Sequence, residues 1–582
     1  MKGFLLTFLI CLFTTFNLCA RTDWYINPTN GANGNVGSNP SLPWQNFSHI
    51  NFHGLGTPVQ AGDTVHIAGT YQGNLGLDFQ VYFLQCLGTS NQPIIFTNWL
   101  GPNWTITQTT NEDALLFKNN TWCQFYNLIV TNCNAGESMT HTTNCGFYNC
   151  QFVMAYTSPM FSLSQNSVSN YFTNCLFSTI ITTGSGCSDG GTDLLYIGNY
   201  QSVSDFSDYN IVENSIFQYE GHAGLELASN SNYCSGCTFI NPCWYLENSC
   251  QTFTNSEGFV YTNYSYWSGR QVSIGGERCS GNVFQNFKCF YGGQVPDQPP
   301  GGVHIENAGN TILRNGLMAC SATAGLEINT EEPTQYAGSN CVYNCTIALC
   351  GFNTSFYVGG QVFNVYYPIY QSPIVLANTT NTSQGFGNNV LVNNLMWANY
   401  QDYISLPGTT NTLSTICSYY ANNWTNTDPG FPSLVNTLSN LPTSVYPLPN
   451  CIITGNSAAA GSGGWLTYIT SPSANNVTSF NITNFNLFSM GRTACFRTIP
   501  SDTIELAGGQ ITQITSINGN TLSVYPPVNI TNNMGVALPY LNNRPSVGYS
   551  DALIPQLFVN GTPSANLKFN SSPTNNFILN SQ

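Results

Sequence analysis

Residues 149–177 read NCQFVMAYTSPMFSLSQNSVSNYFTNCLF and contain the same short phrase twice. The phrase is an asparagine, a small residue or cysteine, a spacer and a large apolar residue, and its copies begin at Asn149 and Asn174. Further copies are Asn214-Ser215-Ile216-Phe217, Cys237-Thr238-Phe239, Asn315-Gly316-Leu317-Met318, Asn344-Cys345-Thr346-Ile347 and Asn394-Leu395-Met396. Several of the intervals are near 25 residues or a multiple of it, which is typical of a repeat protein.

A second phrase, with an apolar, a variable and an apolar residue, recurs out of phase with the first. Its copies are Leu195-Tyr196-Ile197, Leu225-Glu226-Leu227, Trp244-Tyr245-Leu246, Val272-Ser273-Ile274, Val303-His304-Ile305, Leu326-Glu327-Ile328 and Phe356-Tyr357-Val358. The alternation indicates strands with one buried face. Such strands every 19 to 31 residues, with Gly, Asn and Ser turns between them, predict an all-β fold, a parallel β-helix of roughly 13 coils.

The recurring asparagine has a physical explanation in such a fold. Parallel strands on successive coils lie about 4.8 Å apart, so that equivalent residues stack as ladders. A stacked asparagine amide can hydrogen-bond the next coil and satisfy the buried backbone of a turn. We therefore expect ladders of asparagine at the turns.

These features resemble the right-handed parallel β-helix superfamily of pectate-lyase-like proteins. The segments that resemble its N-terminal cap and first coils are Trp24–Pro28, Asn39-Pro40, Pro43-Trp44, Ala61–Tyr71 and Gln92–Asn98. Asp428-Pro429-Gly430-Phe431 is similar to the phrase that often closes such helices. The resemblance covers residues 22–450 and implies no single chemistry, because the superfamily includes lyases, hydrolases, epimerases, adhesins and viral fibres.

The chain divides into four predicted segments. Residues 1–20 have the layout of a secretory signal, with Lys2 before an apolar run and Ala20 at the cleavage point. Residues 21–72 form the cap and first coil, and residues 73–450 the β-helix. Residues 451–582 are a β-rich extension, which we expect to shield the open C-terminal end of the stack. No later stretch is long and apolar enough for a membrane helix, so the predicted product is secreted, extracellular or at the cell surface.

The composition excludes several classes of protein. Of the 582 residues only 6% are charged, with 11 Lys and Arg against 26 Asp and Glu. Nucleic acid is therefore an unsuitable partner, because binding a polyanion requires many basic side chains. Coiled coils need charged flanking positions that this chain cannot fill. Disorder is excluded as well, because 42% of the residues are hydrophobic and 13% are aromatic.

Cysteine and asparagine suggest covalent features of an exported protein. Twenty of the 22 cysteines follow the signal segment, an even number that predicts disulfide stapling in an oxidising compartment. The sequons predict N-glycosylation in a eukaryotic host. They lie at Asn46, Asn103, Asn119, Asn263, Asn344, Asn353, Asn378, Asn381, Asn423, Asn476, Asn481, Asn529, Asn560 and Asn570.

The candidate site lies on the outward residues of the second phrase, because the groove of the family is usually on the outer face of one parallel sheet. Residues 205–332 hold 13 of the 26 acids, which is the strongest local hint in a chain so poor in charge. The candidate catalytic residues are Glu226, Glu247, His304, Glu306 and Glu327. The candidate substrate-binding residues are Tyr196, Tyr245, Arg270, Arg278 and Tyr357. No metal site is predicted.

Two functions remain open at this point. The low charge, with 32 Tyr and 36 Phe, favours an extracellular structural or adhesive protein that binds glycans or further copies of itself. The alternative is a polysaccharide-active glycoside hydrolase or lyase, in which two carboxylates act across a glycosidic bond. No cofactor is expected, with Ca²⁺ left open for the case that the protein is a lyase. The net charge of −15 would repel a polyuronate, so neutral glycans fit better.

Overall fold

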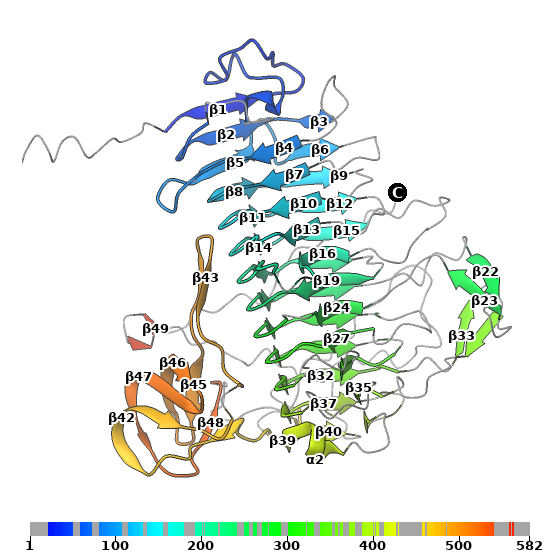
Figure 1. Ribbon diagram of the computed structural model, residues 1–582, viewed down its shortest axis with the longest axis vertical. Coiled ribbons are helices and arrows are strands. Elements are labelled where there is room, and N and C mark those ends of the chain that lie inside the picture. The colour runs from blue at the N-terminus through cyan, green and yellow to red at the C-terminus, as the bar shows by residue number, and fades with distance from the viewer. Residues whose placement is uncertain are drawn as a thin grey trace, which may run out of the picture.

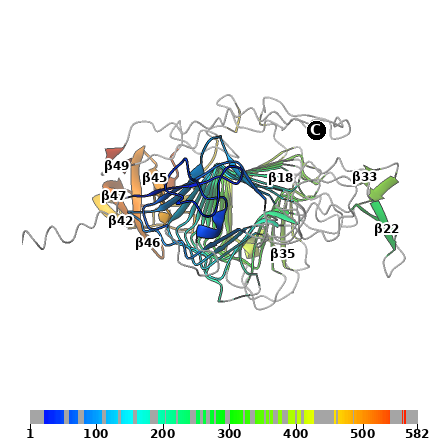
Figure 2. The same cartoon turned by 90° about the horizontal axis from the view of Figure 1, so that it is seen from above.

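The computed structural model describes residues 21–539 apart from stretches between strands, and beyond them only two short strands. Within this range, the longest stretches left out are 51–58, 73–80, 180–192, 241–249, 293–300, 379–386 and 430–456. The described part is a stack of parallel coils that runs the length of the molecule (Figure 1), with a smaller antiparallel domain beside it. Seen along the stack, the strands superpose into three walls around a common core (Figure 2). This confirms the predicted right-handed parallel β-helix.

Three long parallel sheets form the walls. Sheet 1 has 13 strands: β1 (Asp23–Ile26), β2 (Thr64–Ile67), β5 (Ile94–Asn98), β8 (Cys123–Tyr126), β11 (Gly146–Tyr148), β14 (Tyr171–Thr173), β17 (Ile211–Glu213), β20 (Tyr233–Ser235), β25 (Val283–Gln285), β28 (Ile312–Arg314), β31 (Cys341–Tyr343), β36 (Asn389–Val392) and β39 (Cys417–Ala421). Sheet 2 has 11 strands: β4 (Val81–Leu84), β7 (Leu115–Lys118), β10 (Glu137–Thr140), β13 (Phe161–Ser164), β16 (Asp193–Gly198), β19 (Ala223–Ala228), β24 (Arg270–Gly275), β27 (Val303–Glu306), β30 (Leu326–Thr330), β35 (Ile374–Asn378) and β38 (Ile404–Ser405). Sheet 3 has 12 strands: β3 (Thr70–Gln72), β6 (Trp104–Thr107), β9 (Leu128–Thr131), β12 (Gln151–Met154), β15 (Leu176–Thr179), β18 (Ile216–Gln218), β21 (Thr238–Ile240), β26 (Lys288–Phe290), β29 (Leu317–Ala319), β32 (Thr346–Ala348), β37 (Leu395–Trp397) and β40 (Trp424–Thr425).

The two sequence phrases correspond to two of the sheets. The asparagine phrase leads into sheet 3, and the alternating phrase forms sheet 2 from β16 to β30. The expectation fails at Phe356-Tyr357-Val358, which lies on β33 (Ser355–Val358) and pairs antiparallel with β34 (Gln361–Asn364). The next strand of sheet 2 is instead β35, because Ile374 and Leu376 supply the inward apolar pair in register with β30. A similar hairpin joins β22 (Cys250–Thr254) to β23 (Val260–Tyr264).

Aromatic rings fill the core as ladders. Phe96, Phe125, Phe147 and Phe172 stack on successive coils with centroids 4.8, 5.0 and 4.8 Å apart. Each of these rings is fully buried, and burying a phenylalanine stabilises a fold by about 1.5–3 kcal/mol. At the N-terminal end, η1 (Phe47–His49) places Phe47 against this core, and α2 (Leu413–Ile416) places Ile416 in the core at the other end. The stack is therefore a continuous apolar rod closed by short helical turns.

Asparagine ladders are present, as predicted. The amide oxygen of Asn210 accepts from the backbone N–H of Asn170 at 2.9 Å, and that of Asn232 accepts from Asn210 at 2.9 Å. Asn282 continues the ladder by accepting from Asn232 at 2.8 Å. The asparagines of the repeated phrase have a second role, because Asn149, Asn174 and their equivalents have φ near +50°. Asparagine tolerates this left-handed conformation better than most residues.

The predicted disulfide stapling is wrong for the described cysteines, all fourteen of which are free and buried. Twelve of them line the core of the stack, where several thiols contact the coil before them, and Cys341 and Cys495 lie in the cluster between sheet 1 and the C-terminal domain. The Sγ of Cys150 donates to the carbonyl of Phe125 at 3.4 Å, and that of Cys175 donates to Phe147 at 3.5 Å. These thiols act as small core residues with a weak donor, a common role of unpaired cysteine.

The C-terminal domain contains the β-rich strands predicted for it. Its six-stranded sheet contains β41 (Thr467–Tyr468), β48 (Gly535–Ala537), β45 (Thr503–Leu506), β46 (Gln510–Asn518), β47 (Thr521–Ile530) and β42 (Ala474–Asn481). A hairpin of β43 (Arg492–Ala494) and β44 (Arg497–Ile499) extends from it, and β49 (Phe558–Val559) pairs with β50 (Thr562–Pro563). The domain does not cover the end of the stack but lies beside sheet 1 (Figure 1).

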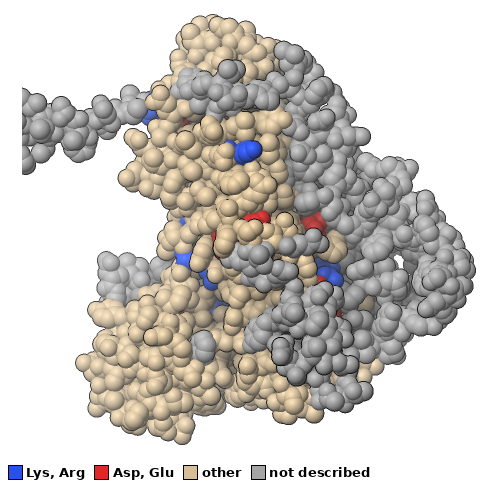
Figure 3. Space-filling view, viewed as in Figure 1, with Lys and Arg blue, Asp and Glu red and all other residues tan. Residues whose placement is uncertain are grey.

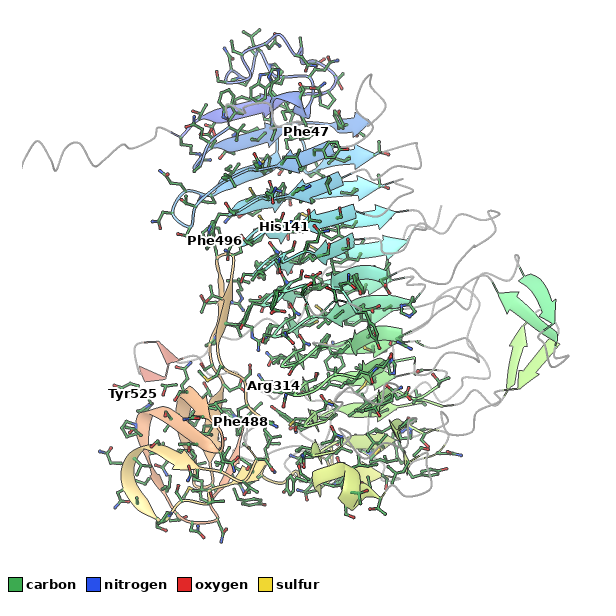
Figure 4. All side chains as sticks on the ribbon, viewed as in Figure 1. Phe47, His141, Arg314, Phe488, Phe496 and Tyr525 are labelled. Atoms are coloured by element: carbon green, nitrogen blue, oxygen red, sulfur yellow. The ribbon has the colours of Figure 1, made fainter. Side chains whose placement is uncertain are left out.

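Ion pairs and aromatic contacts fix this domain to the stack. Arg314 on β28 contacts both carboxylate oxygens of Asp502, at 2.6 and 2.7 Å, and Arg497 holds Glu213 at 2.7 and 2.9 Å. The tip of the hairpin places Phe496 beside Trp122, with centroids 5.2 Å apart. Figure 4 shows Arg314 facing the domain and Phe496 at the tip of the hairpin. The C-terminal domain therefore covers part of the outer face of sheet 1, whereas the residues of the alternating phrase lie on sheet 2.

Candidate functional site

The strand register of sheet 2 brings the predicted outward residues into one ladder. Tyr196 pairs with Glu226, Glu226 with Ser273, Ser273 with His304, and His304 with Glu327. Two positions further along, Glu306 is in register with Asn329. The predicted column therefore exists on the coils formed by β16, β19, β24, β27 and β30.

One predicted site residue lies away from this column, and three others cannot be compared with it because they are outside the described residues. Tyr357 lies on the β33–β34 hairpin, so the expected alignment of Tyr357 with Tyr196 is wrong. Tyr245, Glu247 and Arg278 lie outside the described residues.

His304 lies at the centre of one group of contacts. Its Nδ1 is 3.6 Å from Oε2 of Glu306, and its Nε2 is 3.6 Å from Oε2 of Glu327. Burial first, and then the positive charges of Arg270 and His222, hold the pKa of His304 well below its usual value, while a hydrogen bond with Asn329 opposes this shift. A neutral imidazole can donate from one nitrogen and accept at the other. His304 lies between the two glutamates, although neither 3.6 Å contact is short enough to be a hydrogen bond.

Glu306 is the better exposed of the two glutamates, at 7% against 1% for Glu327. Nη1 of Arg270 lies 3.3 Å from its Oε2, and the hydroxyl of Tyr200 donates to its Oε1 at 2.5 Å. Gly275, in register with Glu306, leaves the space for this arrangement. A Cβ at Gly275 would lie 2.9 Å from the backbone oxygen of Glu306 and 3.0 Å from Cε2 of Tyr200. We call Tyr200, Arg270, His304, Glu306 and Glu327 the Glu306 group.

A second group lies further towards the N-terminus on the same face. Nδ1 of His222 is 2.8 Å from Oδ1 of Asp193 and 3.4 Å from Oε2 of Glu226. Burial and the charge of Glu226 raise the pKa of Asp193 to about 7, although His222 opposes this. Burial disfavours the charged form of His222, but Asp193 and Glu226 outweigh it and raise the pKa of His222 to about 10. We call these three residues the His222 group.

Sequence reasoning missed Tyr200, Asp193 and His222. Asp193 begins the strand that carries Tyr196. His222 precedes Glu226 by four residues, and residues an even number apart in a strand point to the same face, so this spacing could have predicted that His222 lies on the outward side. Tyr200 follows β16 and reaches Glu306 on a strand 106 residues later. No local pattern indicates that contact.

The concentration of acids in residues 205–332 has more than one cause. Asp205 accepts hydrogen bonds from the backbone N–H groups of Gln165 and Asn166, and Asp208 accepts from Asn230. Glu213 and Arg314 contact the C-terminal domain. Only part of the predicted acidic concentration therefore belongs to the face of sheet 2. Figure 3 shows how few charged side chains reach the surface in its view, with several near the middle of the stack.

The structure also limits the predicted glycosylation sites. Asn344 is buried, so a glycan cannot be attached there in the folded protein. Asn423 is half-buried, and its amide binds Asn394 and the carbonyl of Leu391. The exposed acceptors Asn476, Asn481 and Asn529 lie on the C-terminal domain and remain predictions.

The described part of the chain is a right-handed parallel β-helix with a small antiparallel β domain beside it. No protein-family model matches the sequence, and no curated protein matches it. Among solved structures, the chain is similar to the pectate lyase Pel9A, at 14% identity and a TM-score of 0.41 over 76% of this chain and 92% of that chain. A rhamnogalacturonan lyase matches at 14% identity and a TM-score of 0.41, over 75% of this chain and 96% of that one. A lacto-N-biosidase from Eubacterium ramulus matches at 10% identity and a TM-score of 0.35, over 69% and 67%. Such likenesses concern the fold alone.

No helix among the described residues is long and apolar enough to cross a membrane.

Proposed function

We propose that the protein is a secreted, polysaccharide-cleaving enzyme and that the outer face of sheet 2, from β16 to β30, binds the glycan. The observation that supports this best is the Glu306 group. It buries two carboxylates, an imidazole and a guanidinium against one another in a chain that is only 6% charged. Such clusters of buried ionisable groups are most common at functional sites.

The energetic cost of the group favours this function over a structural one. Removing an ion from water costs several kcal/mol even after the protein relaxes. A structural or adhesive face can be solvated by neutral amides and hydroxyls, which this chain has in abundance. The ionisable network is not required for such a face, whereas acid–base catalysis requires it.

The geometry suggests a role for each residue of the group. Glu306 contacts the substrate: its carboxylate takes a proton from the attacking water as the water oxygen bonds to the anomeric carbon, and passes that proton to the glycosidic oxygen as the bond to the leaving sugar breaks. Arg270 and Tyr200 hold its carboxylate in place. His304 and Glu327 act behind it, because a neutral imidazole can pass a proton from one carboxyl group to the other. Neutral glycans are the expected substrates, since a protein with a net charge of −15 repels polyuronates.

The test is cleavage of a panel of neutral and acidic polysaccharides by the purified protein. We expect Glu306→Gln to lower kcat at least about 10²-fold, the usual contribution of an acid–base group. Asp23→Asn is the matched control, because this half-exposed carboxylate lies at the far end of the stack. New reducing ends without an unsaturated sugar would indicate hydrolysis, and an unsaturated product would indicate a lyase. If the wild-type protein cleaves none of the glycans, or Glu306→Gln cleaves them equally well, the proposal is wrong and a structural role is favoured.

A further inference from the structure

The His222 group has the donor set of a metal site and no role in the chemistry above. Asp193, His222 and Glu226 each offer one ligand atom, and these atoms all lie within 4.8 Å of one another. The set is mixed, with one imidazole nitrogen and two carboxylate oxygens. Asp193 and Glu226 are buried, so the structure holds two carboxylates close together with little help from water. An arrangement of this kind favours a bound cation.

One of the distances between ligand atoms matches that around a small divalent ion. Ligand atoms about 2.1 Å from a tetrahedral zinc ion lie roughly 3.4 Å from one another. Nδ1 of His222 is 3.4 Å from Oε2 of Glu226 and 2.8 Å from Oδ1 of Asp193. Small side-chain rotations would open the shorter distance. Calcium fits less well, because it takes six to eight oxygen ligands and the group offers one nitrogen and two side-chain carboxylates.

The fold holds two of the ligands on rigid elements and leaves one side open. Asp193 begins β16, and Glu226 is in the middle of β19, with Ala223 in register with Asp193. His222 directly precedes β19, and its side chain is 31% exposed. An ion can therefore enter from solvent, and three protein ligands leave a position for water or a substrate oxygen. Arg270, in register with Ala223, directs its guanidinium to Glu306.

We propose that Asp193, His222 and Glu226 form a binding site for one divalent transition-metal ion of the zinc class on the outer face of sheet 2. The proposal of this metal site does not depend on the proposed glycan cleavage, although both concern the same face of sheet 2. The competing explanation is that a protonated His222 alone bridges the two carboxylates. The two explanations differ in whether the folded protein takes up a stoichiometric ion.

Zinc binding by the full-length protein distinguishes them. The protein is stripped with a chelator, dialysed and titrated with Zn²⁺ by calorimetry, and the bound metal is counted by elemental analysis. We expect one Zn²⁺ per chain and at least a tenfold weaker affinity in His222→Asn. The matched control is His141→Asn, because His141 is an exposed histidine at a turn with φ of 48°, a conformation that asparagine adopts readily.

A second variant keeps the proposal testable if His222→Asn does not fold, as judged by circular dichroism. Glu226→Gln retains the size of the side chain and should weaken Zn²⁺ binding by a similar factor. Cobalt(II) should give a visible absorption band in the wild-type protein and in His141→Asn, but not in the ligand variants. Absence of binding would overturn the proposal, as would binding that neither ligand substitution weakens. Because no glycan enters the experiment, these outcomes are independent of the cleavage assay.

Discussion

The contact between Arg314 and Asp502 gives the clearest quantitative prediction. Arg314 is buried between the stack and the C-terminal domain, and Asp502 neutralises it through contacts of 2.6 and 2.7 Å. Asp502 also accepts from the backbone N–H of Ser489 at 2.7 Å. Asp502→Asn retains the shape of the side chain but leaves the buried guanidinium uncompensated. Breaking a buried pair in this way costs about 3–5 kcal/mol.

Urea unfolding, followed by tryptophan fluorescence and circular dichroism, measures this cost. We expect the transition of the C-terminal domain in Asp502→Asn to move to lower urea by an amount equivalent to about 3–5 kcal/mol. Arg314→Met in the same background should restore part of the loss, since it removes the stranded charge. Asp23→Asn, whose contact with Arg21 is exposed, should change the unfolding free energy by no more than about 1 kcal/mol. A loss below about 1 kcal/mol in Asp502→Asn would refute the reasoning.

Four further predictions concern the thiols, the buried imidazole, the ladder and the site. In unreduced protein, a thiol reagent should label at least fourteen more cysteines after unfolding than before it, because the fourteen described cysteines are free and buried; a smaller increase would indicate disulfides. Because the pKa of His304 is lowered in the folded state, the unfolded chain binds the extra proton below about pH 6.5. As the pH is lowered through this range, the unfolding free energy should therefore fall, by up to about 1.4 kcal/mol per pH unit. In His304→Gln, urea unfolding at several pH values should show a weaker dependence of the unfolding free energy on pH. Asn210→Ala should cost about 1–3 kcal/mol in urea unfolding, because it leaves buried backbone groups of the ladder unpaired. Gly275→Ala should lower glycan cleavage about 10²-fold by displacing Tyr200 from Glu306, and unchanged activity would contradict the assigned geometry.

Spacing accounts for the parts of the fold that were predicted correctly. Leu225-Glu226-Leu227 and Val303-His304-Ile305 each carry their own strand signal, and a regular stack makes equivalent positions neighbours. The same reasoning failed at Phe356-Tyr357-Val358, because alternation does not specify whether the next strand joins the stack or forms a hairpin. Cysteine counting failed for a different reason. An even number of cysteines is compatible both with disulfide pairs and with free thiols buried in the core. The described thiols are free and buried.

The sequence by itself determined the coiled architecture, the asparagine ladders and the column from Tyr196 to Glu327, because each depends on a period along the chain. Only the tertiary structure decided which charged groups share that face. Tyr200 meets Glu306 across 106 residues, and Arg314 is drawn away to Asp502 across 188 residues. Contacts of this kind depend on side-chain direction and on the packing of the C-terminal domain, neither of which leaves a periodic signal in the sequence.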